Sequence, residues 1–103
     1  MQYAIVFITA PTKKEANKIG KVLLDKRIIA CANIIKDVDS YFWWQGKKER
    51  ATEFLMICKT TKALLKKLIK EVRAIHSYDV PEVIAIPIIA GYRPYLDWIK
   101  EVV

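Results

Sequence analysis

The sequence predicts one α+β domain, residues 1–103, with the element order βαββαβ and a short helix at its end. Two observations predict this class. Apolar runs typical of strands alternate with two stretches in which apolar residues recur at helical spacing. The second and third apolar runs are unusually long and are separated only by Gln45-Gly46, a turn signal. Two split βαβ units of this kind form a four-stranded antiparallel sheet with both main helices on one face.

The first strand and the first helix follow from the N-terminal quarter of the chain. Residues 3–9 form an almost continuous apolar run, and Pro11 ends it. Thr12 and Glu15 have the spacing of a capping box, so we expect a helix from about Thr12 to about Lys26. The apolar face of this helix is predicted to consist of Ala16, Ile19, Gly20 and Leu23.

The next two strands form one long hairpin. The second strand begins at residues 28–35, is interrupted by the polar residues 36–39, and resumes over residues 41–44. Such an interruption predicts a bulge or bend. The third strand ends near Thr60, so each arm is longer than about ten residues, roughly twice a typical strand. Its alternation puts Ala51, Glu53, Leu55, Ile57 and Lys59 on one face, and Thr52, Phe54, Met56 and Cys58 on the other.

The C-terminal elements have clear boundary signals. Thr60 or Thr61 is predicted to cap the second helix, which ends near residue 76. Pro87 cannot donate to a ladder, so the fourth strand, residues 83–86, is expected at an edge or to end there. Pro94 fits the first position of the last short helix. The buried stripe of the second helix is predicted to be Leu65, Leu68, Ile69 and Val72.

The hairpin predicts self-association. The two main helices cover one face of the sheet and leave the other bare, and the long arms overhang the four-stranded body. The tip carries four aromatic side chains that are costly to leave in water, namely Tyr41, Phe42, Trp43 and Trp44. Head-to-tail contacts close into cyclic oligomers, so we predict these residues at an interface between identical chains. The alternative is that they fold back on their own domain.

Composition and charge narrow the function classes. The net charge of +7 and a pI near 9.5 favour phosphate-bearing partners such as nucleic acids. The lysines, however, are spread over the two predicted helices, as is typical of solvated faces. No P-loop, G-x-G-x-x-G, H-E-x-x-H or G-x-S-x-G motif occurs, so no enzyme activity is predicted.

Targeting signals and cysteine usage predict a cytoplasmic protein. No apolar run approaches the roughly 20 residues that span a bilayer, and the first strand lacks the features of a signal peptide. Cys31 and Cys58 lie in apolar runs and form no C-x-x-C pair. We therefore expect two reduced, buried thiols and no membrane partner.

Several blocks of the sequence occur together in a characteristic order. They are Arg27 to Ile34, Ser40-Tyr41 with Trp44 to Lys47, Glu53 with Lys59-Thr60, His76 to Glu82, Gly91, and Tyr95-Leu96 with Trp98. This set resembles the CutA family, the divalent-cation tolerance proteins, over essentially the whole chain. The resemblance implies a ferredoxin-like fold, a very stable homotrimer built through the long hairpins, and a role in tolerance to copper and other divalent metal ions. The architecture is also similar to that of the PII signalling trimers, which bind small ligands in clefts between subunits.

The resemblance also suggests a metal site. The copper site of the bacterial family members is described with a cysteine near the end of strand one and a histidine pair, and the matching positions here are Ile8, Ile75 and His76. His76 is the one histidine of the chain. With Asp79 it is predicted to bind Cu²⁺ or another divalent cation weakly. The alternative is that His76 makes hydrogen bonds at the end of its helix or at an interface.

Four residues are predicted to converge in a ligand cleft between subunits: Trp44, Glu53, Lys59 and Tyr78. Two simpler interpretations stay open. Glu53 and Lys59 share one face of the third strand and can form an ion pair across the sheet. Trp44 and Tyr78 can be ordinary packing residues.

Three classes of function stay open. The first is a cytoplasmic, homotrimeric, copper-binding tolerance protein, with a PII-like signalling trimer without specific metal chemistry as its variant. The second is a nucleic-acid-binding domain, but the RNP1 pattern is missing and no specific nucleic acid is expected. The third is an acylphosphatase-like enzyme, which needs a phosphate loop that residues 9–12 do not offer, since they contain neither Gly nor Arg. No organic cofactor is expected.

Overall fold

The computed structural model of the chain describes residues 2–103. The elements are β1 (Tyr3–Ala10), α1 (Lys13–Asp25), β2 (Cys31–Trp44), β3 (Lys47–Thr61), a 3₁₀ turn (Lys62–Leu64), α2 (Leu65–Ile75), β4 (Val83–Ile88) and α3 (Arg93–Val102). This is the predicted α+β order, βαββαβ with one added helix. The predicted ends of the helices and strands lie within a few residues of the observed ones.

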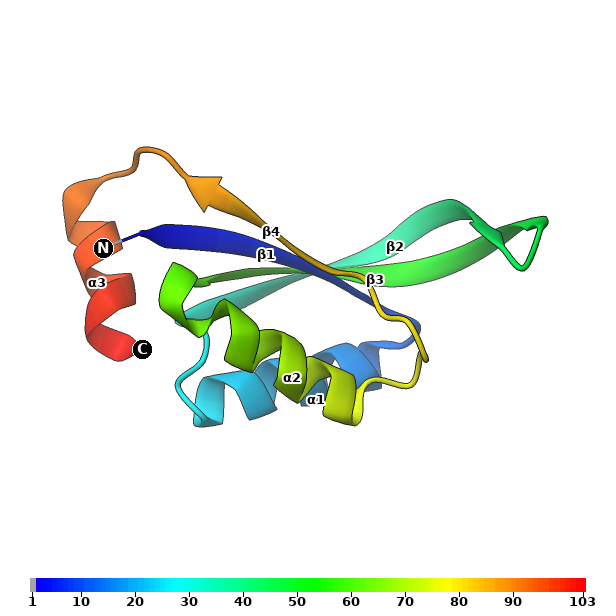
Figure 1. Cartoon of the computed structure of the whole chain (residues 1–103), viewed down its shortest axis with the longest axis horizontal. Helices are drawn as coiled ribbons and strands as arrows, with labels where there is room; N and C mark the ends of the chain where they lie inside the picture. The colour runs from blue at the N-terminus through cyan, green and yellow to red at the C-terminus, as the bar shows by residue number, and fades with distance from the viewer. Residues whose placement is uncertain (1) are drawn as a thin grey trace.

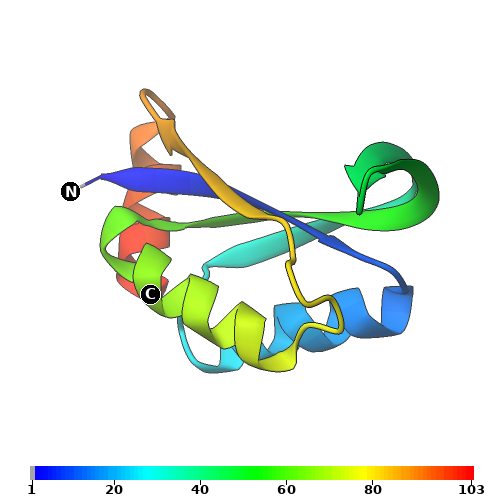
Figure 2. The ribbon, with the colours of Figure 1, turned by 45° about the vertical axis from the view of Figure 1, so that its right-hand side comes forward.

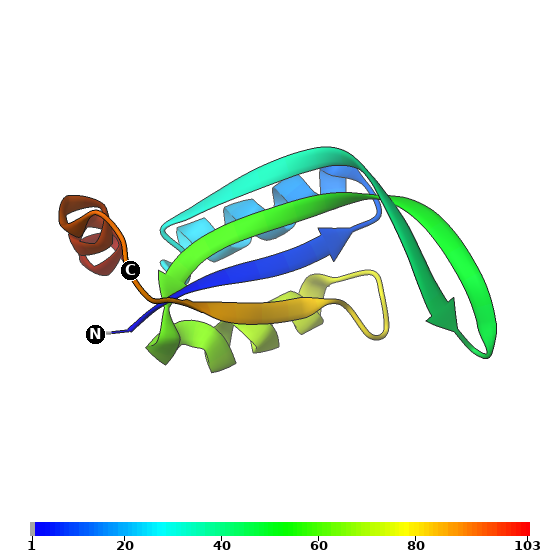
Figure 3. The same ribbon diagram turned by 90° about the horizontal axis from the view of Figure 1, so that it is seen from above.

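The four strands form one antiparallel sheet in the order β2-β3-β1-β4. Helices α1 and α2 lie side by side under one face of this sheet (Figure 1), and the same layering is visible after rotation (Figure 2). No helix covers the opposite face among the described residues, as the view from above shows (Figure 3). Strand β4, which contains Pro87, is an edge strand, as predicted.

The β2–β3 hairpin extends far beyond the rest of the domain. Its arms have 14 and 15 residues, and the longest dimension of the molecule is 44 Å (Figure 1). The register shifts between Ile35 and Val38, and Asp37 has a φ of 60°, so the predicted interruption is a bulge. At the tip, Gln45 and Gly46 have φ values of 51° and 78°, as a two-residue turn with positive φ at both positions requires.

The main core lies between the sheet and helices α1 and α2. Its fully buried side chains come from the sheet and from both helices, and include Val6, Ile8, Ile19, Leu23, Met56, Leu68 and Val72. A second, smaller cluster lies under α3, at the end of the sheet away from the hairpin tip, and consists of Tyr3, Ala30, Leu96 and Ile99. These two clusters anchor the base of the hairpin and leave its outer half without a helix beside it.

The uncovered face of the sheet is apolar. Cross-strand partners on this face include Ile84, Phe7 and Ile57 in one row, and Leu55 with Ile35 in the next. Ile35 and Ile84 keep 46% and 55% of their surface exposed. An apolar sheet face is normally covered by another layer of protein, and the single chain does not supply that layer within residues 2–103.

Two capping predictions need correction. Thr12 caps α1 as predicted, accepting a hydrogen bond of 3.1 Å from the Glu15 backbone N–H. The Glu15 carboxylate completes no capping box, however, because it binds the loop after α2. Neither Thr60 nor Thr61 caps a helix with its side chain. The buried Thr60 hydroxyl instead donates to the Ile28 carbonyl at 2.5 Å and ties β3 to the segment before β2.

Candidate functional site

A groove of about 990 Å³ lies between the hairpin and the loop that follows α2. The hairpin wall contains the aromatic side chains of Tyr41, Phe42 and Trp44. The opposite wall is the loop of residues 77–82, and Thr9 at the end of β1 closes one side. The groove forms because the bulge in β2 bends the hairpin away from the sheet plane (Figure 2).

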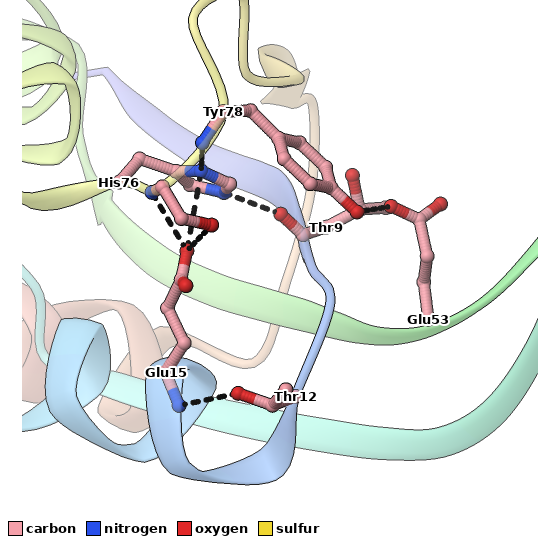
Figure 4. A network of polar contacts seen from close by, with 7 residues as sticks. Thr9, Thr12, Glu15, Glu53, His76 and Tyr78 are labelled. Carbon is pink, nitrogen blue, oxygen red and sulfur yellow. Dashed lines mark hydrogen bonds and ion pairs between the residues drawn. The ribbon is translucent and has the colours of Figure 1, made fainter.

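His76 organises the loop side of the groove (Figure 4). It ends α2, and its side chain has no exposed surface. Ring nitrogen Nε2 lies 2.7 Å from the Thr9 carbonyl oxygen, and Nδ1 accepts a hydrogen bond of 3.0 Å from the Tyr78 backbone N–H. Because a carbonyl only accepts, Nε2 must carry the ring proton, and Nδ1 must offer its lone pair to Tyr78. Both ring nitrogens therefore have partners within the chain, and they fix the loop to β1.

Glu15 fixes the same loop from the helix layer. Its Oε2 atom accepts hydrogen bonds of 3.0 Å from both the backbone N–H and the hydroxyl of Ser77, and it lies 3.3 Å from Nδ1 of His76. Glu15 stands in the first turn of α1, where the helix dipole stabilises a negative charge. The loop is thus held at two points before it reaches the groove.

Glu53 and Tyr78 meet inside the groove (Figure 4). The Tyr78 hydroxyl donates to Oε2 of Glu53 at 2.8 Å, and Glu53 is only 6% exposed. Burial, the hydrogen bond to Glu53 and the nearby negative charges raise the pKa of Tyr78 to about 12. The phenol therefore stays protonated, and keeps donating to the carboxylate, well above neutral pH.

The groove is acidic although the chain is basic. Its lining carries five carboxylates and one cationic side chain: Asp39, Glu49, Glu53, Asp79 and Glu82, with Arg50. Arg50 already pairs with Asp39 at 3.0 Å, and its Nε donates to the Tyr41 hydroxyl at 3.2 Å. The groove thus has the opposite sign to the whole molecule, whose net charge is +7.

Three of the four predicted cleft residues lie together. Trp44, Glu53 and Tyr78 line the groove, but Lys59 does not. The ammonium of Lys59 binds the Asn33 side-chain oxygen on the neighbouring strand β2, and no ion pair between Lys59 and Glu53 forms within residues 2–103. The reason is distance along β3, because six residues separate Lys59 from Glu53 and a strand rises by about 3.3 Å per residue. The location of the cleft between subunits, and the place of Lys59 in it, stay predictions.

The four aromatic residues at the tip are exposed in the single chain. Tyr41 and Trp43 keep 74% and 69% of their surface in solvent, so the alternative in which they fold back on their own domain is not what the chain adopts. The Lys48 ammonium lies over the Trp43 ring, 5.8 Å from its centroid. Their predicted place at an interface stays a prediction.

Metal binding by His76 and Asp79 also stays a prediction. Asp79 lines the groove and is exposed, in the same loop as His76. Within residues 2–103, no group of three or more His, Cys, Asp or Glu side chains is placed to hold one metal ion. A metal at His76 would have to replace one of the two hydrogen bonds of the ring.

Sequence reasoning missed several residues of the site. Thr9 contributes only a backbone carbonyl, which no sequence pattern signals. Glu15 was interpreted as a helix-capping residue, and its real partner is sixty-two positions away. Glu49 and Glu82 had a detectable signal, since acidic residues are sparse in this chain, with 11 against 18 basic ones, yet gather near the hairpin tip and the loop.

The sequence matches the family described as CutA1 divalent ion tolerance protein over residues 4–102. The chain is a member of this family. It is 49% identical over 98 residues to the divalent-cation tolerance protein CutA of Archaeoglobus fulgidus, and the match covers 95% of each chain. The solved structure of the periplasmic divalent cation tolerance protein CutA from the same organism superposes with a TM-score of 0.94 at 47% identity, covering 97% of each chain.

Other CutA proteins show how widely the domain is used. The chain is 41% identical over 97 residues to the chloroplastic CutA 1 of Oryza sativa, matching 94% of this chain and 55% of that one. These names place CutA proteins in the periplasm and in the chloroplast, so a cytoplasmic location of this chain stays a prediction. Within residues 2–103, no helix is long and apolar enough to cross a membrane. The names describe tolerance of divalent cations and no chemical reaction.

Proposed function

We propose that the chain forms a homotrimer that binds divalent metal ions, Cu²⁺ among them, and takes part in tolerance of these ions without being an enzyme. The observation that carries this proposal is the family membership over residues 4–102. The geometry adds two supports, which are the uncovered apolar sheet face and the acidic groove beside His76.

The uncovered sheet face and the hairpin tip support assembly. Ile35, Ile84 and Ile86 are each about half exposed on the open face or its edge, and Trp43 is 69% exposed at the tip. Burying an aliphatic side chain contributes about 1.5–3 kcal/mol, so covering these surfaces with identical chains stabilises each subunit considerably. A heterologous contact, hairpin against neighbouring face, closes into a ring when the rotation is right.

The loop after α2 supports weak metal binding. Asp79 is exposed three residues after His76 in the same loop, and a nitrogen with a carboxylate suits Cu²⁺ or Zn²⁺ better than a hard cation. An incoming ion must displace the Tyr78 N–H from Nδ1 before it binds the ring. That competition costs free energy, and we therefore expect low affinity.

Calorimetric titration with Cu²⁺ and Zn²⁺ tests the metal role. The wild type should bind weakly, and binding should be lost in His76→Ala and in His76→Gln, which keeps a side-chain donor for the Thr9 carbonyl. Asp79→Asn should weaken binding, whereas Asp97→Asn removes the same charge from α3, outside the groove, and should leave it unchanged. Binding that survives both His76 variants excludes this residue as a ligand.

A second function is favoured by the groove itself. A groove of about 990 Å³ with an aromatic wall and several polar side chains has the size of small-ligand sites. We propose that the groove binds a small ligand, in the manner of the PII-like trimers that the architecture resembles. We propose that a neighbouring chain in the trimer borders this groove, so ligand binding should depend on assembly.

A further inference from the structure

The charge of the groove limits what it can bind. Arg50 pairs with Asp39, which leaves four lining carboxylates that form no ion pair within residues 2–103: Glu49, Glu53, Asp79 and Glu82. The chain as a whole carries a net charge of +7, so this concentration of negative charge is local and opposes the average. A ligand with negative charge would be repelled at short range, and a cation would be attracted.

Glu53 supplies an independent observation. It is 6% exposed, and only its Oε2 atom has a partner, the Tyr78 hydroxyl at 2.8 Å. Within residues 2–103, no buried side-chain oxygen or nitrogen is both sealed from solvent and without a hydrogen bond. The second oxygen of Glu53 forms no hydrogen bond within residues 2–103 and is therefore not sealed from solvent, and it belongs to a residue that lines the groove. A nearly buried residue that lines a groove and has one carboxylate oxygen without a donor can accept a hydrogen bond from a ligand.

The walls indicate the kind of cation. Tyr41, Phe42 and Trp44 line the groove and are each at least 41% exposed in the single chain. Aromatic faces attract cations and also pack against methylene groups. No three acidic, His or Cys side chains of residues 2–103 are close enough to share a metal ion, so the groove carboxylates do not converge on one point. Separated charges with apolar surface between them suit an extended organic cation better than a bare ion.

We propose that the groove binds an organic cation with two or more protonated amines joined by methylene chains. One ammonium group bonds the open oxygen of Glu53, a second one meets the exposed carboxylates of the loop and hairpin, and the chain between them lies against the aromatic wall. This inference rests on the small-ligand role proposed for the groove and names the class of ligand. It does not depend on metal binding at His76.

Spermidine is a suitable probe of this class. It is titrated into the full chain in its native assembly at about 150 mM salt, where exposed charges more than roughly 8 Å apart are screened, and binding is followed by calorimetry and tryptophan fluorescence. We expect saturable binding. Glu53→Gln removes a charged acceptor and should weaken binding by about tenfold to a hundredfold.

Two further variants keep the test informative. Glu49 is exposed on the hairpin, and its side chain forms no hydrogen bond within residues 2–103, so Glu49→Gln should fold and should weaken binding by about two- to fivefold. Glu101→Gln removes the same charge from α3, outside the groove, and should leave the affinity unchanged. Equal weakening in Glu53→Gln and Glu101→Gln would reduce the effect to net charge and overturn the proposal.

Competing ligands separate the proposal from the broader small-ligand role. Mg²⁺ at matched ionic strength should displace little spermidine, and full displacement would overturn the preference for an organic cation. Saturable binding of ATP without binding of spermidine would overturn the cationic class while the groove kept a ligand role. If neither compound binds at millimolar concentration, both the class of ligand and the small-ligand function are refuted.

Discussion

Removing the Tyr78 hydroxyl should destabilise the fold measurably, because this hydroxyl is the one hydrogen-bond donor to the Glu53 carboxylate within residues 2–103. The contact is short, 2.8 Å, and Glu53 is only 6% exposed, so water replaces the lost donor poorly. A hydrogen bond to a charged group contributes about 1.5–3 kcal/mol, and we expect Tyr78→Phe to lower the free energy of unfolding by this amount. Guanidinium unfolding at one fixed protein concentration measures it, since assembly makes apparent stability depend on concentration.

A double-mutant cycle with Glu53→Gln separates this contact from packing. If the two side chains stabilise each other through their hydrogen bond, the coupling energy should reach about 1 kcal/mol or more. Tyr95→Phe is the matched control, because it deletes a phenol oxygen whose partner is the Cys31 sulfur, a weak hydrogen-bonding group, at 3.5 Å, and its effect should be smaller. Additive effects of Tyr78→Phe and Glu53→Gln, or a change for Tyr78→Phe within about 0.5 kcal/mol, would refute the reasoning.

The same contact predicts a dependence on alkaline pH. The pKa of Tyr78 is raised from 10.0 to about 12 by burial, by its hydrogen bond to Glu53 and by the charges of Glu53 and Glu15. The folded state therefore holds this proton more tightly than the unfolded state, so the contribution to stability is complete below pH 10 and is lost as pH rises toward 12. Unfolding curves from pH 8 to pH 11 should fall less steeply for Tyr78→Phe than for the wild type. Parallel curves would contradict the assignment.

Further substitutions and one labelling experiment test other parts of the structure. Arg27, directly after α1, has a φ of 56°, a conformation that is unfavourable for residues with a side chain. Arg27→Gly and Arg27→Ala both lose the hydrogen bond to the Val102 carbonyl, but only glycine relieves the backbone, so the Gly variant should be more stable by about 1 kcal/mol in chemical unfolding. Equal stabilities of the two variants would contradict this. Thr60→Val removes the buried donor to the Ile28 carbonyl and should lower the free energy of unfolding by about 1–3 kcal/mol, and Thr60→Ser should recover most of that loss. Wild-type stability of both variants would show that the contact is unimportant. Burial raises the pKa of Cys58 to about 12, so iodoacetamide at pH 8 should label this thiol only after unfolding. Peptide mass spectrometry measures the labelling, and rapid labelling of the native protein would refute the burial of Cys58.

Local signals were enough to predict most of the fold. The turn at Gln45-Gly46, the bulge near residues 36–39 and the edge position of Pro87 each follow from conformational preferences of a few neighbouring residues. The alternation along β3 correctly separated its core face, with Met56 and Cys58 fully buried, from its open face. These features depend on residues close in sequence, and the sequence contains the information directly.

Side-chain partners were much harder to predict. Glu15 has capping-box spacing, yet the loop after α2 brings the backbone N–H and the hydroxyl of Ser77 to its carboxylate. The carboxylate binds these two donors instead of the backbone N–H of the N-cap residue. Lys59 shares a face with Glu53, but the neighbouring strand offers it the nearer Asn33. In each case the sequence pattern described a possible contact, and the three-dimensional neighbours decided which contact formed.

The candidate site was therefore predictable in part. The sequence predicted one cleft for Trp44, Glu53, Lys59 and Tyr78, and the structure places all of these except Lys59 around one groove. The resemblance to CutA proteins suggested His76 as a metal ligand, but its hydrogen bonds to Thr9 and Tyr78 depend on how the loop returns to β1. The negative charge of the groove was also not predictable, because it arises from acidic residues of distant segments that the fold brings together.

The claim that connects the hairpin, the open sheet face and the groove is assembly into a homotrimer. Size-exclusion chromatography with multi-angle light scattering tests it most directly, at micromolar concentration and moderate salt. We predict a single species with three times the subunit mass of 11.9 kDa. A clean monomer of 11.9 kDa would contradict the account, because the exposed tip residues and the apolar sheet face would then have no partner to cover them.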